Sequence, residues 1–155
     1  MRVYTSSHRT SGNISTAKTL AYITSPSTAV VKLLRAEVVA PDDDVNEQMD
    51  IGLQKITSLG TPTATTVTGS KHENGDASPA ATTKFNVTAS EPTYGSTDVD
   101  VVGRKGAPSL AGWAWVPGEK EELTIPPSTS WGLRLLTNLG TGKILTILLT
   151  WGEVG

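Results

Sequence analysis

Residues 144–151 follow a period of two, and this pattern limits the possible folds more than any other stretch of the chain. Every second residue falls on one face of an extended strand, and the opposite face carries the two threonines of the segment together with Ile144 and Leu148. Period-two alternation with β-branched and aromatic residues predicts a half-buried β-strand. The residues of the first face are all large and apolar: Leu145, Ile147, Leu149 and Trp151.

A second apolar segment, residues 131–136, lies shortly before this strand. Residues 138–142 separate the two segments and contain Gly140 and Gly142. Glycine supplies the positive-φ positions that hairpin loops use. The pattern therefore predicts that 131–136 and 144–151 pair as an antiparallel hairpin.

Short apolar segments bounded by turn residues continue along the rest of the chain. Residues 29–40 could also form a helical stripe, but their valines and the preceding Pro26 favour a strand. Many short strands with turn signals between them predict an all-β chain, a single-domain antiparallel β-sandwich, jelly-roll-like, with long polar loops. The further predicted strands are 20–24, 29–40, 48–57, 65–68, 84–88, 98–102, 112–116 and 123–125.

The 155 residues are expected to form one domain with a polar N-terminal extension. Residues 1–19 are interpreted as an N-terminal arm with a possible short strand at 1–5, and residues 20–155 as the β-sandwich domain. Within that domain, residues 58–96 are rich in Gly, Pro, Ser, Thr and Ala. A long segment with so few large apolar residues is expected to lie on the surface as an extended loop region rather than in the core.

Composition argues against several classes of protein. The formal net charge is −2 and lysines and arginines do not cluster, which argues against nucleic-acid binding. The chain has no cysteine, so disulfides and thiolate metal sites are excluded. No stretch approaches the roughly 18 apolar residues of a membrane span. The first residues lack the apolar core of a signal peptide, so synthesis in a cytoplasm is expected.

Residues that could carry chemistry lack the partners that the chemistry needs. Residues 15–18 match the S-x-x-K pattern without its partner motifs, and His8 and His72 lie alone in polar stretches. The acidic run 42–44 with Glu47 has oxygen ligands for a cation but lacks the glycine of a calcium loop. We therefore expect no catalytic, cofactor or metal site, and no enzyme.

Trp113 and Trp115 are two residues apart and share one face of a strand. Such a pair can fill a sandwich core, anchor a protein interface or form a platform on which a sugar stacks. The sequence leaves these three interpretations open.

Several segments together resemble small structural proteins of tailed bacteriophages. The resemblance extends over residues ~20 to 155, and the motifs that carry it are packing motifs. It implies a jelly-roll-like decoration, or cement, protein on the virion capsid surface, made in the host cytoplasm. Such a protein forms a homotrimer and stabilises the shell by binding the major capsid protein. The matching segments are 29–37 (AVVKLLRAE), 46–55 (NEQMDIGLQK), 113–119 (WAWVPGE), 125–128 (IPPS), 132–136 (GLRLL) and 151–155 (WGEVG).

An alternative function is a carbohydrate- or receptor-binding module of a head or tail fibre, with Trp113, Trp115 or Tyr94 stacking on a glycan. Under the decoration hypothesis, the arm and the loop region are expected to contact the capsid or a neighbouring subunit. Removal of residues 1–19 is then expected to weaken attachment and leave the sandwich folded. The predicted interface residues are Val3, Tyr4, His8, Arg9, Phe85, Tyr94, Trp113 and Trp115.

Overall fold

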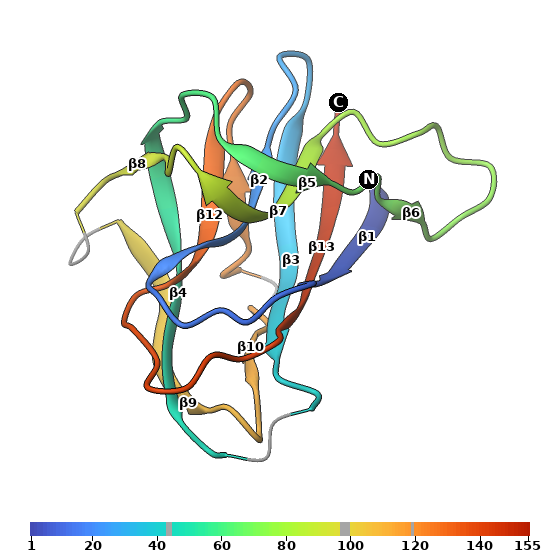
Figure 1. Cartoon of the computed structure of the whole chain (residues 1–155). Helices are drawn as coiled ribbons and strands as arrows, with labels where there is room; N and C mark the ends of the chain where they lie inside the picture. Colours follow the sequence, from blue (N-terminus) through green and yellow to red (C-terminus); the bar gives the residue numbers. More distant parts are fainter. Residues whose placement is uncertain (43–44, 97–99, 119) are drawn as a thin grey trace.

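Two antiparallel sheets pack face to face in the structure, a computed structural model that describes residues 1–42, 45–96, 100–118 and 120–155 (Figure 1). We name each sheet after one of its central strands. The β13 sheet contains β10 (Trp113–Trp115) and β11 (Leu123–Ile125), both paired with β3 (Val30–Val39), followed by β13 (Thr146–Val154), β1 (Arg2–Arg9) and β6 (Ser70–Lys71).

The second sheet, the β12 sheet, is built around β2, β12 and β4. The described residues contain no helix, and therefore none that could cross a membrane. The strand order is β5 (Thr63–Thr66), β7 (Thr82–Ala89), β2 (Lys18–Thr24), β12 (Ser130–Leu135) and β4 (Gln48–Ser58), with β8 (Thr93–Tyr94) and β9 (Val101–Pro108) both paired to the free side of β4.

The order of the strands is that of a jelly roll with an insertion, and we call the segment that contains β5 to β8 the insertion. When these four strands are set aside, the first strand pairs with the last, β1 with β13, and the second with the second last, β2 with β12. The series continues inward, since β3 pairs with β10 and β11, and β4 pairs with β9. This nested antiparallel pairing, distributed over two sheets, confirms the predicted jelly-roll-like sandwich.

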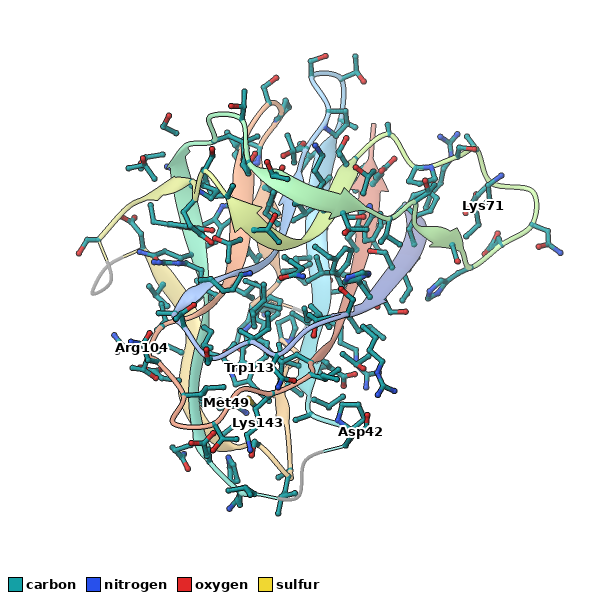
Figure 2. All side chains as sticks on the ribbon, in the orientation of Figure 1. Asp42, Met49, Lys71, Arg104, Trp113 and Lys143 are labelled. Carbon is teal, nitrogen blue, oxygen red and sulfur yellow. The ribbon has the colours of Figure 1, made fainter. Side chains whose placement is uncertain are left out.

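All four tryptophans belong to the core between the sheets. The side chains of Trp113 and Trp151 are at most 1% exposed and belong to the main apolar cluster. Trp115 and Trp131 are half-buried and pack against this cluster. Figure 2 shows Trp113 and Met49 in the space between the two sheets. Of the three interpretations of the Trp113 and Trp115 pair, the structure supports core filling for Trp113.

The predicted hairpin between residues 131–136 and 144–151 is wrong. Both segments are strands, but β12 and β13 belong to different sheets, and the loop between them crosses from one sheet to the other. Each strand must bury an apolar face, and these faces point toward each other across the core instead of lying side by side. Gly140 and Gly142 accordingly do not have the positive φ of a hairpin loop.

The predicted loop region 58–96 is only partly a surface excursion. It contains four strands, and β7 lies inside the β12 sheet, paired with both β5 and β2. Phe85 of β7 is fully buried in the main core. At Asn86 the backbone has a φ of 54°, and the next residue, Val87, is buried in a second cluster. This break in the alternation lets one strand contribute to two apolar clusters.

Residues 1–19 are also not a detachable arm. The predicted strand exists, but it extends to Arg9 and lies between β13 and β6. Tyr4 is fully buried against Trp151, with ring centroids 5.8 Å apart. Ile14, further along the segment, is buried and bridges to Lys143. Deletion of residues 1–19 would therefore remove a strand that carries buried core residues, and the expectation that the sandwich stays folded is corrected.

Replacement of Tyr4 by alanine tests this placement. We expect Tyr4→Ala to lower the free energy of unfolding by about 3–5 kcal/mol, the usual cost of truncating a buried aromatic side chain. Val3, on the outer face of the same strand, is the matched control. Val3→Ala is expected to cost less than about 1 kcal/mol. Urea denaturation of both variants measures the difference, and equal costs would contradict the placement of β1 in the sheet.

Candidate binding surface

The outer faces of the two sheets differ in how much of their surface is covered. The outer face of the β12 sheet carries a second apolar cluster, formed by Tyr22, Ile56 and Val87. Part of the insertion lies over it: Leu59, Ala64 and Tyr94 pack against these three residues. Five successive residues of β2, from Thr19 to Ile23, are buried for this reason, because the strand has protein on both sides.

A polar network attaches the insertion to the β12 sheet. The Glu91 carboxylate accepts hydrogen bonds from the Thr19 backbone N–H at 3.1 Å and from the Thr19 hydroxyl at 2.5 Å. The same hydroxyl lies 2.5 Å from the Tyr94 hydroxyl. The Arg134 guanidinium stacks 4.1 Å from the centre of the Tyr94 ring and donates to the Gln54 side chain at 2.7 Å. These contacts join four segments that are far apart in the sequence.

The network depends on a glycine in β12. A Cβ on Gly132 would lie 2.9 Å from Cε1 of Tyr94 and closer still to its hydroxyl, so the ring fits only because position 132 has no side chain. The Gln54 side chain extends the network by donating to the Gly95 carbonyl at 2.6 Å. Burial of the Tyr94 ring raises the pKa of its hydroxyl.

Replacement of Gly132 by alanine is expected to release the insertion from this face. The added methyl group would displace Tyr94, and we expect a loss of about 1–3 kcal/mol of stability, as for other overpacked sites. Hydrogen exchange should increase in residues 89–96. Gly12→Ala is the control, because a Cβ there meets nothing within 4 Å. Unchanged exchange in Gly132→Ala would show that Tyr94 does not hold the segment.

The three tyrosines of the chain predict a loss of stability in alkaline solution. Burial is the main cause that raises the pKa of Tyr4, Tyr22 and Tyr94 above the ordinary value of 10.0. The folded state therefore favours the neutral hydroxyls, and an unfolded chain ionises them at lower pH. Stability should be complete below about pH 10 and fall as the pH rises above it. Tyrosinate absorbance and circular dichroism should change together, whereas ionisation before unfolding would contradict the burial.

The outer face of the β13 sheet is open. Its residues form rows across the strands: Ala114 pairs with Glu37, Glu37 with Leu148, and Leu148 with Ser7. No other described strand or apolar cluster lies over this face. We define the β13 face by the following residues: Arg35, Glu37, Val39, Ala114, Val116 and Leu148.

Several apolar side chains of the β13 face are in contact with solvent. Val39 is 40% exposed and Val116, directly after β10, is 65% exposed. The charges at its centre neutralise each other, because Arg35 donates to the Glu37 carboxylate through Nε at 2.9 Å and also through Nη2. The β13 face therefore combines exposed apolar side chains with a charge pair that needs no further partner.

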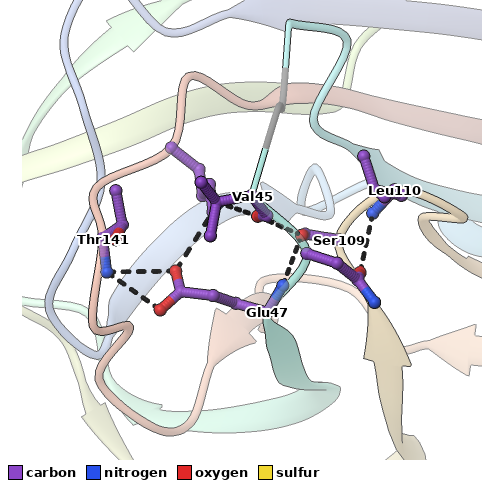
Figure 3. Close-up of polar contacts among 7 residues, drawn as sticks. Val45, Glu47, Ser109, Leu110 and Thr141 are labelled. Atoms are coloured by element: carbon purple, nitrogen blue, oxygen red, sulfur yellow. Dashed lines mark hydrogen bonds and ion pairs between the residues drawn. The ribbon is translucent and has the colours of Figure 1, made fainter.

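Two more exposed apolar residues, Val45 and Leu110, continue the β13 face at one end of the sandwich. They are neighbours, because the Leu110 N–H donates to the Asn46 side chain and the Ser109 hydroxyl donates to the Val45 carbonyl (Figure 3). The turn that carries Leu110 continues to Gly112, where a Cβ would lie 2.7 Å from the Val39 side chain. The apolar surface therefore extends from the sheet onto the loops.

A buried charge pair fixes these loops in place. Lys143 is 4% exposed and its Nζ lies 3.6 Å from the Glu47 carboxylate and donates to the Val45 carbonyl. The same carboxylate accepts hydrogen bonds from the Thr141 N–H at 2.9 and 3.0 Å (Figure 3). A buried lysine is costly unless it is paired and hydrogen-bonded, and here it is both. The sequence gives no sign of this pair, because 96 positions separate its two members.

The structure corrects part of the predicted interface. Tyr4, Phe85 and Trp113 are at most 1% exposed, so their side chains cannot contact a partner. Tyr94 and Trp115 are half-buried, and both pack against the protein's own chain.

Three of the predicted interface residues remain accessible on β1. His8 is half-buried, with its ring centroid 5.8 Å from that of Phe85. Val3 and Arg9 lie on the outer face of β1, beside the β13 face, and Arg9 forms an ion pair with Asp42. Their contact with a partner stays a prediction.

The described residues bear on the predicted absence of a metal site. They contain no group of three or more His, Asp or Glu side chains that could hold a metal ion. Asp43 and Asp44 of the acidic run lie outside the described residues. A hollow of about 490 Å³ is lined in part by Glu153, whose carboxylate already accepts hydrogen bonds from the Ala80 and Ala81 N–H groups at 2.8–3.1 Å. The open β13 face is the best candidate for function.

Comparison with known proteins adds no assignment. No family model, no curated protein and no solved structure matches the chain. The functional argument therefore rests on the sequence motifs and on the two unequal faces of the sandwich.

Proposed function

We propose that the chain is a virion structural protein, a capsid decoration protein that binds and stabilises an assembled major capsid shell through its β13 face. The observation that carries the proposal is the difference between the two outer faces. The chain uses its own insertion to cover the β12 sheet and leaves the β13 face open, with Val39 and Val116 exposed. The resemblance of residues 29–37, 46–55 and 113–119 to phage structural proteins supplies the class of partner.

The chemistry of the β13 face suits attachment to a large protein surface. A sheet of paired strands is already ordered, so the backbone that carries Leu148 and Ala114 needs no further ordering when the face is covered. The exposed valines and leucines supply apolar area, at roughly 25 cal/mol for each Å² removed from water. Arg35 and Glu37 form a pair that can remain together in the bound state.

Stabilisation of the shell follows from mass action. A protein that binds only the assembled shell adds RT ln(1 + [L]/Kd) at each site, and a shell offers many sites. The resemblance also implies a homotrimer. Three linked copies would bind with higher avidity than one, because each further copy docks at a high effective concentration. The proposal requires no enzymatic step and no cofactor.

The composition of purified particles tests the proposal. Heads and tails are separated and the copies of the chain are counted by quantitative mass spectrometry. We expect many copies per particle, confined to heads, because a decoration protein occupies repeated positions of the shell. A few copies on tails would favour the receptor-binding alternative, and absence from particles would contradict the virion assignment.

The same particles test whether the β13 face is the attachment surface. Particles grown without the chain are incubated with purified protein and sedimented. Val116→Asp and Leu148→Asp should each raise the dissociation constant at least about tenfold, since a buried, unpaired carboxylate at an interface costs more than about 1.4 kcal/mol. Thr88→Asp, at an exposed position on β7, is the matched control and should bind normally. Equal binding by all three variants would show that the β13 face is not the attachment surface.

A further inference from the structure

Asn74 and Gly75 occupy the centre of an exposed turn in the insertion, shortly after β6. The Asp76 N–H donates to the Glu73 carbonyl at 3.1 Å, which closes the turn around them, and both residues are exposed. The turn belongs to the loop that follows Lys71 and projects from the body of the sandwich (Figure 2). We propose that Asn74 is a site of self-modification, at which the side-chain amide is lost and an aspartate or isoaspartate forms.

The reaction needs an amide nitrogen that can reach the asparagine side chain, and Gly75 provides one. Within the described residues the Gly75 N–H has no hydrogen-bond partner. Gly75 has no side chain to hinder the approach, and a Cβ built there would meet nothing within 4 Å. An exposed turn with so few contacts opens locally at little cost in free energy.

The other four asparagines of the chain lack these conditions. In three of them the next residue is bulky and its N–H is already engaged: Ile14 donates to Lys143, Glu47 to Ser109, and Leu139 to Ser15. The fourth, Asn86, precedes Val87, a β-branched residue that is 1% exposed. The fold therefore selects a single position from the five: Asn13, Asn46, Asn74, Asn86 and Asn138.

The atoms of the reaction balance with water as the only co-reactant. The deprotonated Gly75 nitrogen bonds to Cγ of Asn74, the Cγ–Nδ2 bond breaks, and ammonia leaves with the proton from Gly75. Water then opens the five-membered imide. Cleavage at Cγ gives aspartate, and cleavage at the main-chain carbonyl carbon gives isoaspartate. Either product adds one negative charge to a turn that already carries Glu73 and Asp76.

Peptide mapping of the purified full-length chain tests the proposal. Trypsin places each asparagine on a peptide of its own, and residues 72–84 form the peptide with Asn74. After incubation near neutral pH, this peptide alone should lose an ammonia, gain a water and show isoaspartate. The rate should rise about tenfold for each pH unit, because the attacking species is the deprotonated amide.

The variant Gly75→Ala isolates the attacking nitrogen. Because the added methyl group meets nothing and the φ of Gly75 is not positive, the variant should fold normally and lose most of the modification. Thermal unfolding checks that the fold is retained. Modification of Asn13, Asn46 or Asn138 as fast as that of Asn74 would overturn the proposal. An unchanged rate in Gly75→Ala would also overturn it.

Discussion

The pairing of β1 with β13 is the interaction on which the rest of the structure depends. It joins the beginning of the described chain to its end, from Arg2 with Glu153 to Arg9 with Thr146, and it places both strands inside the β13 sheet. Tyr4 and Trp151 meet on the core side of this pair. Every further pair of the jelly roll is nested inside it, so little of the core can close before distant segments meet. Folds built from such long-range pairs form slowly, because loop-closure entropy is lost before the contacts form.

The insertion makes the two outer faces of the sandwich unequal, because it covers part of one of them. A plain sandwich would leave the outer faces of both sheets in water. Here Tyr94, Glu91 and their partners hold the insertion over the β12 sheet, which makes that side thicker and leaves one open face. The Glu153 carboxylate fixes the other part of the insertion by accepting from Ala80 and Ala81. The network of Thr19, Glu91 and Tyr94 therefore helps to cover one face, and Val39 and Val116 are exposed on the other.

The sequence predicted the strands better than it predicted their partners. Alternation is a local property, so residues 29–40, 48–57 and 123–125 could be recognised as β3, β4 and β11. Pairing is not local: the segments 131–136 and 144–151 looked like a hairpin because a glycine-containing loop joins them, yet their apolar faces oppose each other across the core.

The burial of single residues was also difficult to predict where the surrounding residues are small and polar and therefore indicate a surface loop. Phe85 lies in a stretch of small and polar residues, but it occupies the main core because β7 extends a sheet whose other strands are distant in sequence. The Glu47 and Lys143 pair and the Thr19, Glu91 and Tyr94 network left no local pattern at all. What the sequence did predict, the all-β sandwich, follows from periodicity along single strands.

The edges of the β13 sheet indicate how a partner would approach it. On one side the edge strands β10 and β11 have three residues each, and prolines at 117, 126 and 127 follow them. On the other side β6 has two residues, one of them Lys71, and pairs only with Tyr4 and Thr5 of β1. Short strands and prolines oppose the addition of a further strand at the β10 and β11 edge. A partner on that side of the sheet would therefore bind its face, where Val116, Leu148 and the Arg35 and Glu37 pair offer side chains. The features that block association at the β10 and β11 edge are consistent with binding at the β13 face.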